Sequence, residues 1–153
     1  KGQEAVYTGL QTARSTLALK GDVVGNATAG NITELVICVT NALNGASIDL
    51  TGPTNNGGVA GNTSQNVVVV SYADSTQRVD DLYFQAAQLG TGNGDSQLDP
   101  GETFQMTIDL EAVAGGGVGT YHTFEIDIKP PVGSVLVIER TTPAALSDWL
   151  ILN

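Results

Sequence analysis

Two segments in the second half of the chain alternate apolar and polar residues strictly, and this alternation most restricts the possible folds. In the segment 103–111 the apolar positions are Phe104, Met106, Ile108 and Leu110. In the segment 121–129 they are Phe124, Ile126 and Ile128. Successive side chains of a strand point to opposite faces, so a period of two predicts β-strands with one buried and one solvated face. The Gly-rich run 115–120 between them predicts a hairpin loop.

The rest of the chain after Gly21 consists of short apolar runs separated by Gly, Asn and Pro. Nearly continuous apolar runs, which predict strands covered on both faces, occupy 32–39, 67–71 and 135–138. Weaker strand candidates occupy 17–24, 48–50 and 80–84. Seven or eight short strands separated by turn signals predict a mainly β domain over residues 20–153. We expect an antiparallel β-sandwich or barrel of Ig-like type.

The first 19 residues follow a different pattern. Apolar residues recur there at spacings of four, three and four, at Val6, Leu10, Ala13 and Leu17. These spacings predict an amphipathic α-helix over residues 1–19. Because no N-cap residue stands before Gly2, we expect the segment 1–19 to be the C-terminal part of a longer helix that begins upstream.

The charge of the chain excludes several classes of partner. Six basic residues against 16 acidic residues give a formal net charge of -10. Nucleic-acid binding requires clustered Lys and Arg to neutralise phosphates, so we expect no nucleic-acid partner. An anionic membrane surface is disfavoured for the same reason. No stretch of the sequence approaches the roughly 18 consecutive apolar residues of a membrane span.

Catalytic chemistry has little support in the sequence. The single histidine, His122, is in phase with Phe124, which predicts a histidine at the edge of the core with one ring nitrogen satisfied. The single cysteine, Cys38, lies in an apolar run and is predicted to be a small buried hydrophobic residue. Motifs of serine hydrolases, metalloproteases and phosphate-binding loops are absent. We therefore expect a protein that is not an enzyme and has no organic cofactor.

The acidic loop 93–102 is the best candidate for a binding site. Its oxygen-bearing residues at short spacing are Asn93, Asp95, Asp99 and Glu102. A hard divalent cation such as Ca²⁺ binds six to eight oxygens gathered by a flexible backbone, which this Gly-containing loop offers. The loop is too short for an EF-hand, and a strand follows it. The alternative interpretation is that Asp and Asn are ordinary turn residues here.

Three N-x-[ST] sequons provide candidate glycosylation sites, at Asn26, Asn31 and Asn62. Three sequons are a small excess over chance in a chain so rich in Ser and Thr, so their number decides little. Asn26 and Asn62 lie in Gly-rich segments that we expect to be exposed.

Several loose motifs follow one another along nearly the whole chain. They are the helical start 1–10, Gly21-Asp22-Val23-Val24-Gly25, Ile32-Thr33-Glu34-Leu35-Val36-Ile37, Leu98-Asp99-Pro100-Gly101-Glu102-Thr103-Phe104 and the segment 131–143, which begins Pro131-Val132-Gly133-Ser134. In these motifs the chain resembles the archaellins, the archaeal flagellins that build the archaellum filament.

The resemblance implies a type IV pilin-like subunit. In such a subunit a hydrophobic N-terminal helix packs in the filament core and a β-sandwich outer domain forms the surface. It implies a homo-oligomeric helical filament, held by the N-terminal helix and by contacts between outer domains. The filament would be extracellular, on the cell surface, and would serve swimming motility and surface attachment. We expect the hydrophobic part of the helix to lie upstream of Lys1.

The resemblance also bears on the candidate sites. It implies N-glycosylation, for which Asn26, Asn31 and Asn62 are the acceptors, and it is consistent with a cation in the acidic loop 93–102. Asp80 and Asp81 are weaker candidates for that cation site.

The competing hypothesis for the function of the protein is an Ig-like cell-surface adhesin or carbohydrate-binding module that uses the long loops 51–65 and 90–101.

Overall fold

The computed structural model describes residues 17–41, 47–90, 95–113, 116–131 and 133–152, and both alternating segments form strands in it. They are β10 (Thr103–Asp109) and β11 (Thr123–Lys129), and in each strand every second side chain is buried. The sequence prediction of two half-buried strands is therefore confirmed.

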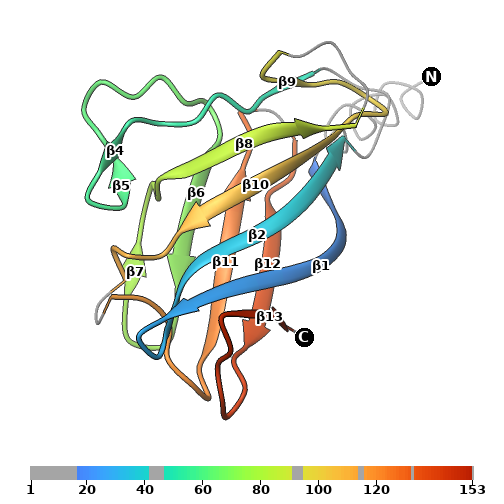
Figure 1. Ribbon diagram of the computed structural model, residues 1–153. Coiled ribbons are helices and arrows are strands. Elements are labelled where there is room, and N and C mark those ends of the chain that lie inside the picture. Colours follow the sequence, from blue (N-terminus) through green and yellow to red (C-terminus); the bar gives the residue numbers. More distant parts are fainter. Residues whose placement is uncertain (1–16, 42–46, 91–94, 114–115, 132, 153) are drawn as a thin grey trace, which may run out of the picture.

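Two antiparallel sheets make up most of the described chain (Figure 1). The first has the order β13-β1-β2-β10-β8. Its other strands are β1 (Leu17–Thr28), β2 (Asn31–Asn41), β8 (Phe84–Leu89) and β13 (Trp149–Leu152). The second has the order β12-β11-β6-β7, with β6 (Val69–Ala73), β7 (Arg78–Val79) and β12 (Leu136–Thr141).

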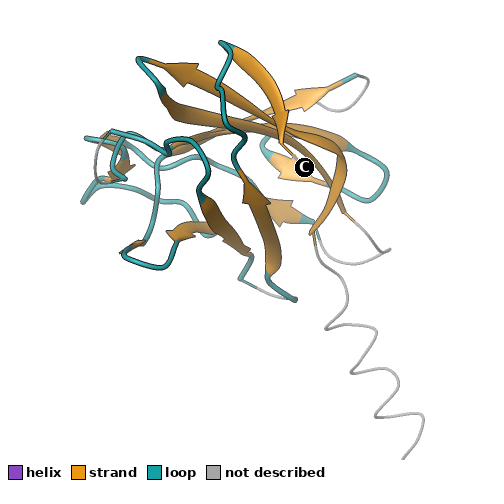
Figure 2. Cartoon of the chain, turned by 90° about the horizontal axis from the view of Figure 1, so that it is seen from below, coloured by secondary structure: helices purple, strands orange, loops and turns teal. Residues whose placement is uncertain are grey.

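Four shorter strands form two ribbons beside the sheets. They are β3 (Ile48–Asp49), which pairs with β9 (Gln97–Leu98), and β4 (Asn55–Asn56), which pairs with β5 (Val59–Ala60). The main sheets lie in two layers (Figure 2), and their inward side chains form one buried apolar core. The structure is thus the predicted antiparallel sandwich, with two separate sheets and not a closed barrel.

The predicted hairpin between β10 and β11 is wrong. β10 lies between β2 and β8 in the first sheet, whereas β11 lies between β12 and β6 in the second. The connecting segment therefore crosses from one layer to the other. Alternation reveals which side of a strand is buried but not which strand pairs with it. Strands of both layers have one solvent-exposed face, so the pattern does not distinguish the layers.

The apolar runs differ in how well they are covered. The run 32–39 belongs to β2, which is central in its sheet, but its outer face bears the half-buried residues Val36 and Cys38. The prediction that Cys38 is buried is therefore wrong. The run 135–138 lies largely in the edge strand β12, and Val137 within this strand and Val135 just before it are exposed. An apolar run alone does not reveal whether its strand is central or at an edge.

The predicted N-terminal helix is only partly covered by the structure. Residues 1–16 lie outside the described residues, and Leu17–Leu19 belong to β1, so the helix prediction is wrong at 17–19. The competing strand candidate 17–24 is confirmed. Leu17 is buried and pairs with Asn41, a partner that local spacing does not reveal. Within the described ranges, no helix has the length and apolar character needed to cross a bilayer.

Candidate functional site

The acidic loop brings three of its four predicted ligands together. Carboxylate oxygens of Asp95, Asp99 and Glu102 all lie within 4.8 Å of one another, and Asn93 lies outside the described residues. The loop is placed by β9, which pairs with β3, and by β10, which begins immediately after Glu102. The sequence spacing therefore indicated the correct carboxylates, and the tertiary structure gathers them at one end of the sandwich.

Neutral donors hold these carboxylates in place. Glu102 accepts hydrogen bonds from the backbone N–H of Asp99 at 2.9 Å and from the side-chain amide of Gln88 at 2.7 Å. Asp99 accepts a hydrogen bond from the Ser47 hydroxyl. Asp95 accepts one from the backbone N–H of Gln97 at 3.0 Å, an ordinary Asx-turn contact. The loop is thus a set of ordered turns as well as an acidic cluster, so both interpretations of the sequence describe part of it.

The two weaker candidates for this site lie elsewhere. Asp80 forms an ion pair with Arg78 at 2.8 Å, and Asp81 accepts a hydrogen bond from the Asn66 amide at 3.3 Å. Both precede the start of β8, whereas the acidic loop lies beyond its end, where Leu89 pairs with Thr103. The structure does not bring Asp80 or Asp81 into the three-carboxylate group.

The three sequons occupy different environments. Asn62 and Thr63 are exposed in a turn of the 51–66 connection. Asn26 is half-buried within β1, and its side-chain amide donates a hydrogen bond to Glu34 at 3.2 Å. Asn31 is half-buried at the start of β2, next to Ile32, which forms an isolated bridge with Val118. Asn62 is the most accessible of the three.

A buried carboxylate that sequence reasoning missed lies at the other end of the sandwich. The side chain of Asp74 has an exposed fraction of 0%, and its Oδ2 lies 2.9 Å from Nε2 of His122. Because an ionised carboxylate only accepts hydrogen bonds, Nε2 of His122 is the donor. Asp74 also accepts from the hydroxyl of Tyr72 and from Thr76 and Gln77 in the β6–β7 turn.

The hydrogen bonds to Asp74 decide its charge. Burial by itself raises the pKa of a carboxyl group, but the donors from Tyr72, His122 and Thr76 outweigh burial and hold the pKa of Asp74 well below its usual range. Burial raises the pKa of Tyr72, and its hydrogen bond to ionised Asp74 raises it further. Asp74 is therefore ionised in the folded protein and ties the β6–β7 turn to the start of β11.

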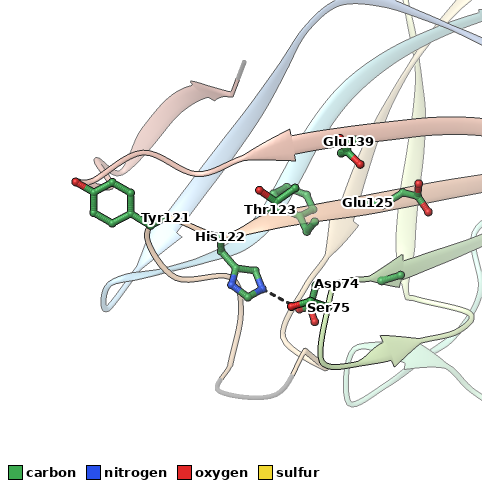
Figure 3. A pocket seen from close by; sticks show the side chains of 9 residues that line it. Asp74, Ser75, Tyr121, His122, Thr123, Glu125 and Glu139 are labelled. Carbon is green, nitrogen blue, oxygen red and sulfur yellow. Dashed lines mark hydrogen bonds and ion pairs between the residues drawn. The ribbon is translucent and has the colours of Figure 1, made fainter.

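A hollow of about 510 Å³ opens beside this pair. Figure 3 shows His122 directed at Asp74, while Glu125 and Glu139 line another part of the hollow. The charge of Asp127 is the main cause that raises the pKa of Glu125, and Glu139, which pairs with Glu125 in register, adds to the effect. The predicted core-edge position of His122, with one nitrogen satisfied, is confirmed. Its Asp74 partner lies 48 positions away, and no local signal indicates it.

Comparison with known proteins establishes the family. The sequence profile described as archaeal-type flagellin matches residues 1–140. The chain belongs to the archaeal-type flagellin family. Probable flagellin 1 of Archaeoglobus fulgidus is 29% identical over 159 residues, which cover 99% of this chain and 77% of that protein. Probable flagellin 1 of Aeropyrum pernix is 22% identical, with 95% and 76% covered.

Solved structures agree with the sandwich fold. The archaeal flagellum of Methanospirillum hungatei strain JF1 has a TM-score of 0.67 at 21% identity, with 99% of this flagellin and 79% of that chain covered. A crystal structure of an archaeal flagellin from Methanocaldococcus jannaschii also has a TM-score of 0.67, at 17% identity, with 89% and 95% covered. The resemblance to archaellins that the sequence motifs indicated is confirmed.

The Asp74 interaction predicts an acid-sensitive fold. Because the pKa of Asp74 is lowered on folding, its contribution to stability is present above the unfolded pKa of about 3.9 and is lost as the pH falls below that value. We expect Asp74→Asn to lower the free energy of unfolding by about 2 kcal/mol at pH 7 and to flatten its decline in acid. Urea unfolding at a series of pH values measures both effects.

The matched control is Asp80→Asn, which removes an exposed carboxylate that is paired with Arg78. We expect this variant to change stability by less than about 1 kcal/mol and to keep the decline in acid. Equal acid profiles for wild type and Asp74→Asn would contradict the assignment of this decline to Asp74.

Proposed function

We infer that this protein is a structural subunit of the archaellum, the extracellular filament that propels archaeal cells. The family match over residues 1–140 carries this conclusion. A flagellin is a building block and not an enzyme, which agrees with the role of His122 as a partner of a buried carboxylate. The match supports the filament subunit and gives no support to the adhesin or carbohydrate-binding hypothesis.

Assembly follows from the two parts of the chain. We propose that the residues before Leu17 contribute the end of an N-terminal helix to the filament core, and that the β-sandwich is the outer domain on the filament surface. The sandwich begins by Leu17, so the junction between the two parts lies before this residue. Neighbouring copies would then make contact through both parts, and the exposed domains would also serve attachment of the cell to surfaces.

Deletion of the gene in the source organism tests the filament assignment. We expect loss of swimming and of the filament in electron micrographs, and recovery of both when the gene is restored. Mass spectrometry of sheared filaments should identify this chain as a main component. Filaments that keep their composition and motility in the deleted strain would contradict the assignment.

We propose that the acidic loop binds a divalent cation, for which Ca²⁺ is the first choice. Three carboxylates whose oxygens lie within 4.8 Å repel one another by about 1 kcal/mol per pair even in bulk water. A hard cation would replace this repulsion with attraction, and carboxylate oxygens are the ligands it prefers. Asp95 is exposed, which leaves a route from solvent to the cluster. Asn93 is a further proposed ligand.

Thermal unfolding tests the cation proposal. At millimolar Kd values, typical of extracellular sites, 10 mM Ca²⁺ should raise Tm by about 5 °C relative to excess chelator. The double substitution Asp95→Asn and Asp99→Asn should abolish this difference, whereas Asp80→Asn and Asp81→Asn should preserve it. A Tm that is equal with chelator and with Ca²⁺ would overturn the proposal.

We propose that the protein is N-glycosylated, first at Asn62. Asn62 and Thr63 are exposed in a turn, so this sequon can enter the active site of a glycosyltransferase without unfolding a strand. Asn26 and Asn31 are half-buried members of β1 and β2, which makes them poorer acceptors in the folded domain.

Glycopeptide mass spectrometry of protein from native filaments tests this order. We expect glycan mass on the peptide with Asn62 at higher occupancy than on those with Asn26 and Asn31. Asn62→Gln should remove this mass, and Asn26→Gln, as the matched control, should leave it unchanged. A native Asn62 peptide without added mass would contradict the proposal.

A further inference from the structure

A patch of apolar side chains lies on the outer face of the five-stranded sheet. Trp149 and Ile151 of the edge strand β13 have exposed fractions of 59% and 55%. Their neighbours Val24 of β1 and Val36 of β2 are half-buried on the same face. We call these four residues the outer patch.

Strand register makes the outer patch continuous. Val24 pairs with Ile151 on one side and with Val36 on the other, and Trp149 pairs with Asn26 one row away. Paired residues of antiparallel strands have Cβ atoms about 5 Å apart, so these side chains contact one another along the row. The inward neighbours Val23 and Leu152 are buried, which confirms that the patch is on the opposite, outer face.

The outer patch also extends to the edge of the sandwich. β13 is the edge strand of the first sheet and β12 that of the second, and β12 contacts β1. Seven large apolar side chains are exposed among the described residues, and four of them lie on or next to these two edge strands: Val135, Val137, Trp149 and Ile151. Apolar side chains on an open edge are a typical feature of a surface that becomes covered.

The distribution of charge on this face of the sheet indicates what kind of partner covers the outer patch. The row that contains Ile151, Val24 and Val36 continues through two uncharged polar residues, so it crosses all five strands without a charge. These two are Thr107 and Gln85. In a chain of net charge -10, two copies repel each other over most approaches. The next row of the same face contains Trp149 and Asn26 and continues to Glu34 and Asp109 on β2 and β10, so the uncharged part of this face lies at β13 and β1. Copies can meet on that part, which holds Trp149, Ile151 and Val24, with less of this repulsion.

We propose that the outer patch is a contact surface for the outer domain of a neighbouring copy in the filament. This inference rests on the proposed function, because the filament is what holds the copies together. An isologous contact closes at a dimer, so a contact that continues along a filament is heterologous, and the patch meets a different face of its neighbour.

The size of the patch sets the strength of this contact. Trp149 and Ile151 expose apolar area on the order of 250 Å², whereas a stable free complex buries roughly 800 Å² per partner. The contact is therefore too small to hold two free outer domains together. It forms where the assembled filament already provides a high effective concentration of neighbours.

The single Trp of the 153 residues is a direct probe of the patch. We expect the emission of Trp149 to shift to shorter wavelength, and its acrylamide quenching constant to fall at least threefold, in isolated filaments relative to the unassembled 153-residue chain. Filaments with Trp149→Phe provide the background to subtract. Equal quenching in filaments and in the unassembled chain would overturn the contact while leaving the filament assignment intact.

One other outcome would also overturn the contact. If protection in the filament were lost with Asn26→Gln, the cover would be a glycan on the paired strand β1. Absence of this chain from filaments would contradict the proposed function itself. The gene deletion and the mass spectrometry of sheared filaments test that separately.

A charge placed in the patch supplies an independent test. Ile151→Glu should make filaments dissociate at a temperature several degrees lower, with the largest difference in dilute buffer. Val67→Glu is the matched control, because Val67 is a similar β-branched residue, 44% exposed, that lies next to β6 in the other sheet. Equal loss of filament stability in both variants would contradict a specific role of the outer patch.

Discussion

The burial of two facing rows of apolar side chains between the sheets is the interaction on which the rest of the structure depends. The strands β10 and β11 provide every second residue to this core, and strands far apart in the chain meet there: the ring of Tyr72 in β6 stacks on that of Phe124 in β11, with centroids 5.9 Å apart. The acidic loop, the Asp74 cluster and the outer patch all lie at the ends or on the outer faces of this core. Their positions follow from how the two layers are stacked.

The surface of the domain has a different chemical character in different places. One end gathers three carboxylates in the acidic loop, and the other buries the ionised carboxylate of Asp74, which accepts hydrogen bonds from Tyr72 and His122. Between them, the outer face of the larger sheet is uncharged where β13 and β1 present Trp149, Ile151 and Val24. In the proposed filament contact, like-charged copies would meet on this uncharged part, where the repulsion between them is weakest.

Much of the architecture could be predicted, and the failures have a common cause. Alternation located β10 and β11 and their buried faces, and residue spacing identified Asp95, Asp99 and Glu102 as neighbours. Pairing could not be predicted, because alternation fixes a face and not a partner. The hairpin between β10 and β11 therefore failed. The burial of Cys38 failed because this residue lies on the outer face of its sheet. The Asp74–His122 pair was missed because its members are brought together only by the packing of β6 against β11.

The sequence by itself determined the fold class, the family and the carboxylates of the acidic loop, since these follow from local periodicity, ordered motifs and short spacing. Only the tertiary structure decided which strands stand at the edges, which side chains remain exposed there and which of the three sequons is accessible. The physical reason is that burial is a property of the assembled layers. An apolar run contributes mainly to the core when its strand is central in a sheet, as in β2. A similar run is largely exposed when its strand is at the edge, as in β12.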